Sequence, residues 1–242
     1  MGHSDHELAP LLADLEEPDK PTLRKAVDAL IGMAADEARV VTILSELLNE
    51  PSRKNRWPMA YILASLPSPS PASITVLIET LDHPDPDIRW AVTLILIRLA
   101  KTDRQVLKLL MALTSKGTAN QRRMAIYSLR DAGLGNEESV QALMDALQDS
   151  DPTVRVAAVT SLRMEAKLSE NRKNELLQLF LKDQDPRVRN SAAVTLAQLG
   201  APSEQFLSEL VKAKASNDAQ LKKAASAAFD ILKNKRSAPS GS

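Results

Sequence analysis

The side chains that most often perform catalysis are sparse in this chain. Among its 242 residues there is no cysteine, and there are three histidines, His3, His6 and His83. The absence of cysteine excludes disulfides, thiolate metal ligands and a cysteine nucleophile. His3 and His6 have a spacing that can bind a metal adventitiously, and His83 falls in a predicted turn between helices. Phosphate-binding, dinucleotide-binding, zinc-protease and nucleophile-elbow motifs do not occur. We therefore predict no catalytic residue, no metal site, no cofactor and no enzymatic activity.

Aromatic and basic side chains offer a different chemistry, the recognition of another molecule. Both tryptophans and both tyrosines of the chain lie between residues 57 and 127. Tryptophan, tyrosine and arginine are the residue types that most often dominate the binding energy of protein interfaces. The partner-binding residues predicted from this cluster and its helical neighbours are Trp57, Tyr61, Trp90, Leu94, Ile97, Arg123, Tyr127 and Arg130.

A phrase that recurs along the chain indicates which elements position these side chains. It reads DPDIRWAVTLIL from residue 85, DPTVRVAAVTSL from residue 151 and DPRVRNSAAVTL from residue 185. In each copy the arginine is followed by a small apolar residue three positions later and by leucine seven positions later. A fixed period of this size is typical of a solenoid. With weaker copies included, the basic anchor residues are spaced by 32 to 34 residues and are Arg24, Arg56, Arg89, Arg122, Arg155, Arg189 and Lys222.

Each repeat is predicted to contain two helices. Between the copies of the phrase lie other apolar segments with helical spacing, such as Ile74, Leu77 and Leu81. Neither kind of segment shows the alternation expected of a strand. We therefore predict an all-α solenoid of fourteen helices, arranged as seven antiparallel pairs in one right-handed superhelix over residues 1–233. The polar segment NKRSAPSGS, residues 234–242, is predicted to be a disordered tail.

The recurring phrase opens with a helix-start signal. Aspartate is a good N-cap, because its carboxylate accepts hydrogen bonds from amides of the first turn, and proline suits the first helical position. The arginine follows the aspartate by one turn, where the two side chains can pair. In the fifth repeat this predicts an ion pair between Asp151 and Arg155. In the second repeat, Pro58 predicts a helix that starts late, near Asn55, or that kinks.

The periodicity also predicts which face of the second helices meets a partner. Positions three and seven residues after the anchor face the core, so positions one, five and eight fall toward the concave surface. All eight predicted partner-binding residues occupy these positions. In one interpretation Trp57 and Trp90 pack against neighbouring loops, and in the other the aromatic residues form an exposed patch. Their concentration in three adjacent repeats favours the patch.

The same surface has an excess of basic side chains. One acidic residue, Asp230, is predicted to lie there. We therefore expect a partner with an acidic segment. The basic residues are Lys25, Arg123, Arg130, Arg163 and Lys223.

These residues resemble HEAT repeats, and more narrowly the HEAT-like repeats of phycobilisome bilin lyases. The resemblance rests on the pattern D-x-x-V-R-x-x-A-x-x-x-L and covers nearly the whole chain. It implies that the second helices line the concave surface and that aspartate and arginine form a ladder inside the stack. Repeats one, two, four and seven lack the Asp-Pro step, and the seventh has Lys222 in place of arginine. The ladder is therefore in doubt in these repeats.

Three functions are compatible with this pattern. The leading one is a non-enzymatic scaffold that binds an extended or helical segment of another protein on its concave face. The alternative implied by the resemblance is a protein that handles a tetrapyrrole, with aromatic faces stacked on the pigment and arginines paired with its propionates. The third is nucleic-acid binding, as in the HEAT-like DNA glycosylases. Equal numbers of basic and acidic residues, 31 each, and the absence of a basic cluster disfavour that third function.

Sequence features also carry expectations about location and assembly. The first twenty residues have no basic region followed by a long apolar stretch, so no secretory signal is expected. The apolar runs are too short for a transmembrane helix. We predict a cytoplasmic protein without membrane insertion that is monomeric outside its complex.

Overall fold

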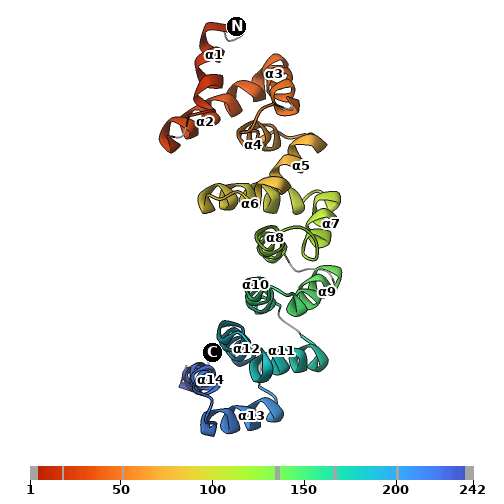
Figure 1. Ribbon diagram of the computed structural model, residues 1–242. Coiled ribbons are helices and arrows are strands. Elements are labelled where there is room, and N and C mark those ends of the chain that lie inside the picture. The colour runs from red at the N-terminus through yellow and green to blue at the C-terminus, as the bar shows by residue number, and fades with distance from the viewer. Residues whose placement is uncertain are drawn as a thin grey trace. The chain divides into compact units, whose positions relative to one another are not determined.

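The computed structural model describes residues 5–17, 19–50, 52–133, 137–165, 168–199 and 202–237. Within these residues all regular structure is helical, with fourteen α-helices and one short 3₁₀ helix (Figure 1). The predicted all-α class and the number of helices are therefore confirmed. The chain divides into two compact units, Met1–Leu99 and Ala100–Ser242. The first unit contains six helices. The last of them ends at Ala100, which is the first residue of the second unit.

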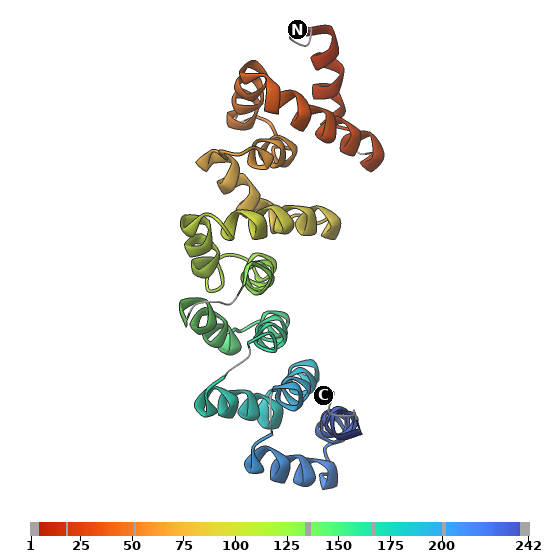
Figure 2. The ribbon, with the colours of Figure 1, turned by 180° about the vertical axis from the view of Figure 1, so that it is seen from behind.

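The first unit places helices from successive repeats side by side. Helices α3 and α5 lie on one side, and α2, α4 and α6 lie on the other (Figures 1 and 2). Helix α2 packs against both α3 and α4, and α4 packs against α5. The helices are α1 (Asp5–Asp14), α2 (Lys20–Asp36), α3 (Ala38–Asn49), α4 (Trp57–Ser65), α5 (Pro71–Thr80) and α6 (Pro86–Ala100).

The second unit repeats the same alternation. Helices α8, α10, α12 and α14 pack in succession along one side, and α7, α9, α11 and α13 lie along the other. The helices are α7 (Arg104–Leu113), α8 (Ala119–Ala132), α9 (Glu137–Asp145) with the 3₁₀ turn Ala146–Gln148, α10 (Pro152–Leu162), α11 (Glu170–Lys182), α12 (Pro186–Gln198), α13 (Glu204–Ala215) and α14 (Ala219–Ser237).

The core lies at the positions that the periodicity assigned to it. Ala158 and Ala192, three residues after their anchors, are fully buried, and so is Leu162, seven residues after its anchor. Small side chains allow neighbouring helix axes to approach closely, while each fully buried leucine contributes about 1.5–3 kcal/mol. This division of roles explains why the phrase repeats: each second helix docks onto the preceding one in the same way.

The Asp-Pro step starts helices as predicted. Asp151 accepts a hydrogen bond from the Thr153 amide at 2.7 Å, and Asp185 accepts one from the Arg187 amide at 2.8 Å. Asp85 accepts the Asp87 amide at 2.9 Å. Each of these aspartates is therefore the N-cap of its own second helix.

The predicted ion pair between Asp151 and Arg155 is wrong. Arg155 instead donates through Nε and Nη2 to both carboxylate oxygens of Asp183, at 2.8 Å each. Asp183 belongs to the turn of the next repeat, and the carboxylate of Asp151 is already engaged by its own helix start. The pairing is therefore between repeats.

Two helix boundaries differ from the expectations. Helix α4 starts late, as Pro58 predicts, but at Trp57, two residues after Asn55, with Pro58 in its first turn. Helix α14 extends to Ser237, so residues 234–237 are helical and not part of a disordered tail. The remainder of the predicted tail, residues 238–242, lies outside the described residues. The sequence NKR contains good helix formers without a stop signal, which explains the continuation.

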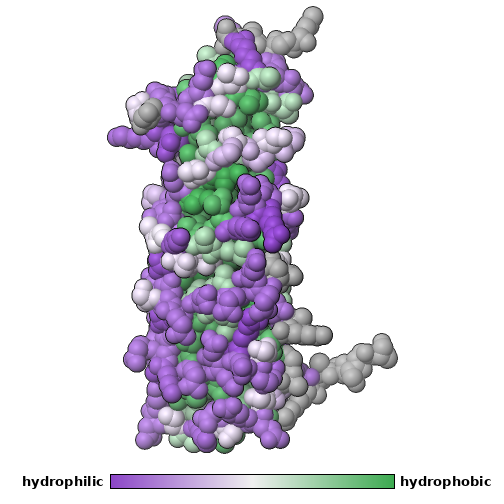
Figure 3. Space-filling model, turned by 90° about the vertical axis from the view of Figure 1, so that its right-hand side faces the viewer, coloured by the Kyte–Doolittle hydropathy of each residue, from purple (hydrophilic) through white to green (hydrophobic). Residues whose placement is uncertain are grey.

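Figure 3 shows one side of each unit. Hydrophilic side chains cover most of it, and hydrophobic atoms appear in larger areas over the first unit than over the second. None of the helices in the described ranges is both long enough and apolar enough to cross a membrane.

Candidate partner-binding groove

A groove of about 530 Å³ lies between α2, α4 and α6 in the first unit. We call it the aromatic groove. Four of the predicted partner-binding residues line it, and they come from two successive second helices. The lining consists of Lys20, Leu23, Arg24, Val27, Asp28, Trp57, Tyr61, Asp87, Ile88, Trp90, Ala91 and Leu94.

The apolar side chains of this groove are open to solvent. Trp90 is 43% exposed and Leu94 is 50% exposed. Trp57 and Tyr61 are half-buried, and their rings meet edge to face with centroids 6.3 Å apart. Such a pair is rigid and amphipathic, and it presents a large apolar area at low entropic cost. Trp57 and Trp90 are therefore not sealed inside the stack.

The short helix α4 gives the groove its depth. It has nine residues, whereas α2 has 17 and α6 has 15. Lys20, at the start of α2, forms ion pairs with Asp85 at 2.8 Å and Asp87 at 2.7 Å, at the start of α6. These ion pairs join the starts of the two longer helices, next to the point where α4 begins. Charged side chains therefore close one end of the aromatic groove.

The rim of the aromatic groove carries both signs of charge. The hydrogen bonds from Lys20 to Asp85 and Asp87 raise the pKa of Lys20, and the bond to Asp85 is the main cause of the lowered pKa of Asp85. Arg24 is largely exposed and lies 4.0 Å from Asp28, one turn further along α2. The basic excess predicted for the concave surface is therefore not a property of this groove.

Ile97 does not belong to the accessible surface. It is only 7% exposed, although it was predicted to bind a partner with Trp90 and Leu94. At about 100° per residue, the eighth position after the anchor lies roughly 60° closer to the core direction than the fifth. A large apolar side chain at that position turns into the core.

The remaining predicted residues lie together on α8 in the second unit. Arg130 stacks over the ring of Tyr127 at 5.1 Å and pairs with Asp131 at 2.6 Å. This hydrogen bond raises the pKa of Arg130. Arg123 donates to Asn120 at 3.1 Å. The predicted partner-binding residues thus lie in two groups, one in each unit. A concave surface that includes both groups stays a prediction.

Helix α2 contributes side chains that sequence reasoning missed. Leu23 and Val27 line the groove, whereas Lys25, one position after the anchor, was predicted to lie on the concave surface. The cap explains the shift: Asp19 caps α2 and precedes the anchor Arg24 by five residues, whereas Asp85, Asp151 and Asp185 precede their anchors by four. The position of this aspartate is the signal that could have corrected the register.

The aromatic groove combines apolar side chains with charged side chains at its rim. In the described part of the chain there is no group of three or more His, Asp or Glu side chains that could hold a metal ion. The chemistry that the groove offers is apolar contact, aromatic stacking and a charged rim.

The fold defines a class, the helical-pair solenoids. A family model for HEAT repeats matches residues 40–130 and 106–179. These matches together cover more than half of the 242 residues. The chain therefore belongs to the HEAT-repeat family. No curated protein matches the sequence.

Several solved structures are similar to this chain at low sequence identity. A chain from the structure of Kap95p with RanGDP is 15% identical, with a TM-score of 0.59, and the match covers 99% of this chain and 35% of that one. Human deoxyhypusine hydroxylase in complex with glycerol is 16% identical, with a TM-score of 0.44 and coverage of 95% and 96%. A designed armadillo repeat protein in complex with the peptide (KR)4 is also 16% identical, with a TM-score of 0.42 and coverage of 93% and 99%. The narrower likeness to bilin lyases stays a prediction.

Proposed function

We propose that this chain is a non-enzymatic scaffold that binds a helical or extended segment of another protein in the aromatic groove. The observation that carries the proposal is the exposure of Trp90 and Leu94, 43% and 50%, in a groove that Trp57 and Tyr61 also line. Exposed apolar patches on soluble proteins mark interaction sites. Tryptophan and tyrosine are the residue types that most often dominate such interfaces.

The groove suits a narrow partner element. An incoming segment would lie over α4, between α2 and α6, with its apolar side toward Trp90 and Leu94. The Lys20 ion pairs with Asp85 and Asp87 limit its path at one end. Laying the apolar face of a helix into a hydrophobic groove is a common recognition mode.

Apolar contact, and not net charge, would provide most of the affinity. Lys20 and Arg24 on the rim are balanced by Asp28 and Asp87. Rim charges mainly affect association rate and choice of partner. We therefore expect binding at the aromatic groove to depend only weakly on salt.

A photo-crosslinking experiment tests this site. The photoreactive residue p-benzoylphenylalanine replaces Leu94, and as a matched control it replaces Leu109 of α7, which is 48% exposed. In the native host, the Leu94 variant should give a discrete crosslinked protein that the Leu109 variant does not give. The crosslinked peptide identifies the partner segment, which can then be made recombinantly.

Binding of that segment provides the decisive comparison. Leu94→Asp should weaken its affinity at least about tenfold, because the charge would be buried against the apolar segment. Leu109→Asp should leave the affinity unchanged. Equal crosslinking from both positions, or a segment that binds Leu94→Asp as well as wild type, would contradict the proposal.

A further inference from the structure

The arginine ladder of the second unit has a regular geometry. Arg122 donates to both carboxylate oxygens of Asp149, at 2.6 and 2.7 Å, and Arg155 donates to Asp183 in the same way. Each of these aspartates also accepts, at 2.8 Å, the amide N–H of the residue two positions later. Each aspartate therefore stabilises its own turn and also pairs with the arginine of the preceding repeat.

In the first unit, a histidine occupies the position of that aspartate. His83 accepts the amide N–H of Asp85 through Nδ1 at 3.1 Å, as Asp149 and Asp183 do through their carboxylates. Because Nδ1 is the acceptor, the neutral ring carries its proton on Nε2 and is a donor there. A donor cannot replace a carboxylate as the partner of an arginine.

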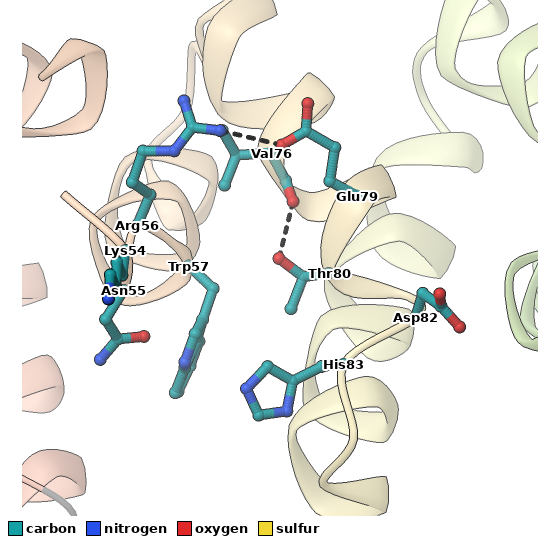
Figure 4. A pocket seen from close by; sticks show the side chains of 9 residues that line it. All are labelled: Lys54, Asn55, Arg56, Trp57, Val76, Glu79, Thr80, Asp82 and His83. Atoms are coloured by element: carbon teal, nitrogen blue, oxygen red, sulfur yellow. Dashed lines mark hydrogen bonds and ion pairs between the residues drawn. The ribbon is translucent and has the colours of Figure 1, made fainter. Parts of the chain in front are cut away.

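Arg56, the anchor of the preceding repeat, therefore has a different partner. It bonds to Glu79 of α5 at 3.0 Å, turned away from His83 (Figure 4). The side chain of Arg56 is 35% exposed, compared with 16% for Arg122 and 14% for Arg155, and Glu79 is 56% exposed. This ion pair is thus a solvated substitute for a buried ladder pair.

A pocket of about 450 Å³ lies where the ladder is interrupted. We call it the Trp57 pocket. Its volume is in the range of small-ligand sites. Trp57 and His83 extend into the same region of it from α4 and from the turn after α5 (Figure 4). Lys54 and Arg56 add two cationic side chains to the lining, and Glu79 and Asp82 add two acidic ones, of which Asp82 points away from Trp57 and His83 (Figure 4). No side chain caps the first turn of α4.

We propose that the Trp57 pocket binds a carboxylate, the Asp or Glu side chain of the partner segment, in place of the missing ladder aspartate. The donors for it are the guanidinium of Arg56, the Nε2–H of His83 and the ammonium of Lys54. Trp57 lines both this pocket and the aromatic groove. A segment in the groove can therefore place one acidic side chain here, so this inference rests on the proposed function.

Glu79 sets the expected strength of the interaction. Glu79 forms an ion pair with Arg56 in the unbound protein, so an incoming carboxylate must displace Glu79. Because Glu79 is the more exposed partner, it returns to water at little cost. Glu79→Gln should consequently tighten binding of a carboxylate severalfold. His83→Asp should block the site, because the protein's own carboxylate would then occupy it.

The test uses a small mimic and the two tryptophans as reporters. N-acetyl-glutamate methylamide is titrated into ¹⁵N-labelled protein, with the glutamine analogue as the neutral isostere. The indole N–H signals of Trp57 and Trp90 are assigned through Trp57→Phe and Trp90→Phe variants. We expect the Trp57 signal to shift saturably with the glutamate mimic, with a millimolar dissociation constant as befits so small a ligand, and not with the glutamine analogue.

Two variants make the result specific. His83→Asp should weaken binding of the mimic at least tenfold while it raises the melting temperature, since it restores a ladder pair with Arg56. Glu79→Gln should strengthen binding. Equal shifts with both analogues, no shift of the Trp57 signal, or equal binding by wild type and His83→Asp would each overturn the carboxylate site. Because the mimic needs no partner protein, its failure would leave the aromatic groove standing, and failure of crosslinking at Leu94 would contradict the groove alone.

Discussion

At the scale of single residues, the ladder shows what a one-dimensional pattern can and cannot provide. The repeat identifies Arg155 as an anchor, and a spacing of four residues makes Asp151 its apparent partner. The structure pairs Arg155 with Asp183, 28 residues away. Which carboxylate an arginine reaches depends on how successive repeats stack, and that information is not contained in spacing along one helix.

The Arg155 pair should be important for stability. Its two side chains are 14% and 5% exposed, and Arg155 also donates to the carbonyl of Asp149 at 2.7 Å. Arg155→Ala would leave a buried carboxylate without its cation, so the free energy of unfolding should fall by about 2–3 kcal/mol. Urea denaturation measures the loss.

Arg187 provides the matched control for this change. It pairs with Asp185 but is 62% exposed, so Arg187→Ala should cost less than about 1 kcal/mol. Similar small losses for both variants would show that the ladder pair is a solvated contact.

At the scale of helices, starts were more predictable than ends. The Asp-Pro step marks the first residues of α6, α10 and α12 because capping is a local interaction. The end of α14 was missed, since no glycine or proline interrupts the helix before Ser237. The register of α2 was also missed, because its capping aspartate is displaced by one residue.

The capping aspartates make stability dependent on pH. The hydrogen bond from the side chain of Arg187, followed by its amide, lowers the pKa of Asp185 to about 2 from an unfolded value of 3.8. A carboxyl with a lowered pKa contributes stability that is fully present above its unfolded pKa and is lost as the pH falls toward its folded pKa. Asp185→Asn should therefore be less stable than wild type above pH 4, and the difference should shrink between about pH 4 and pH 2.

Urea denaturation of both proteins across this range measures that difference. A difference that stays constant with pH would mean that the charge of Asp185 does not stabilise the start of α12.

At the scale of the whole molecule, the repeat pattern predicted the fold class but only part of the site. Apolar periodicity sufficed for fourteen helices, because each helix needs a buried stripe. It placed Trp57, Tyr61, Trp90 and Leu94 on one surface, and these residues do line one groove. The division into two compact units was not predicted. The Trp57 pocket was also missed, since it depends on a single histidine, His83, at the position that Asp149 and Asp183 occupy in the fifth and sixth repeats.

The central claim is that the aromatic groove binds a partner through Trp90. The most direct measurement is calorimetric titration of the crosslink-identified segment into wild type and Trp90→Ala. We expect Trp90→Ala to weaken binding by about 2 kcal/mol or more, roughly thirtyfold. The variant should remain folded and lose much less stability than Leu162→Ala, for which about 2–5 kcal/mol is expected. A folded Trp90→Ala protein that binds the segment as tightly as wild type would contradict the account.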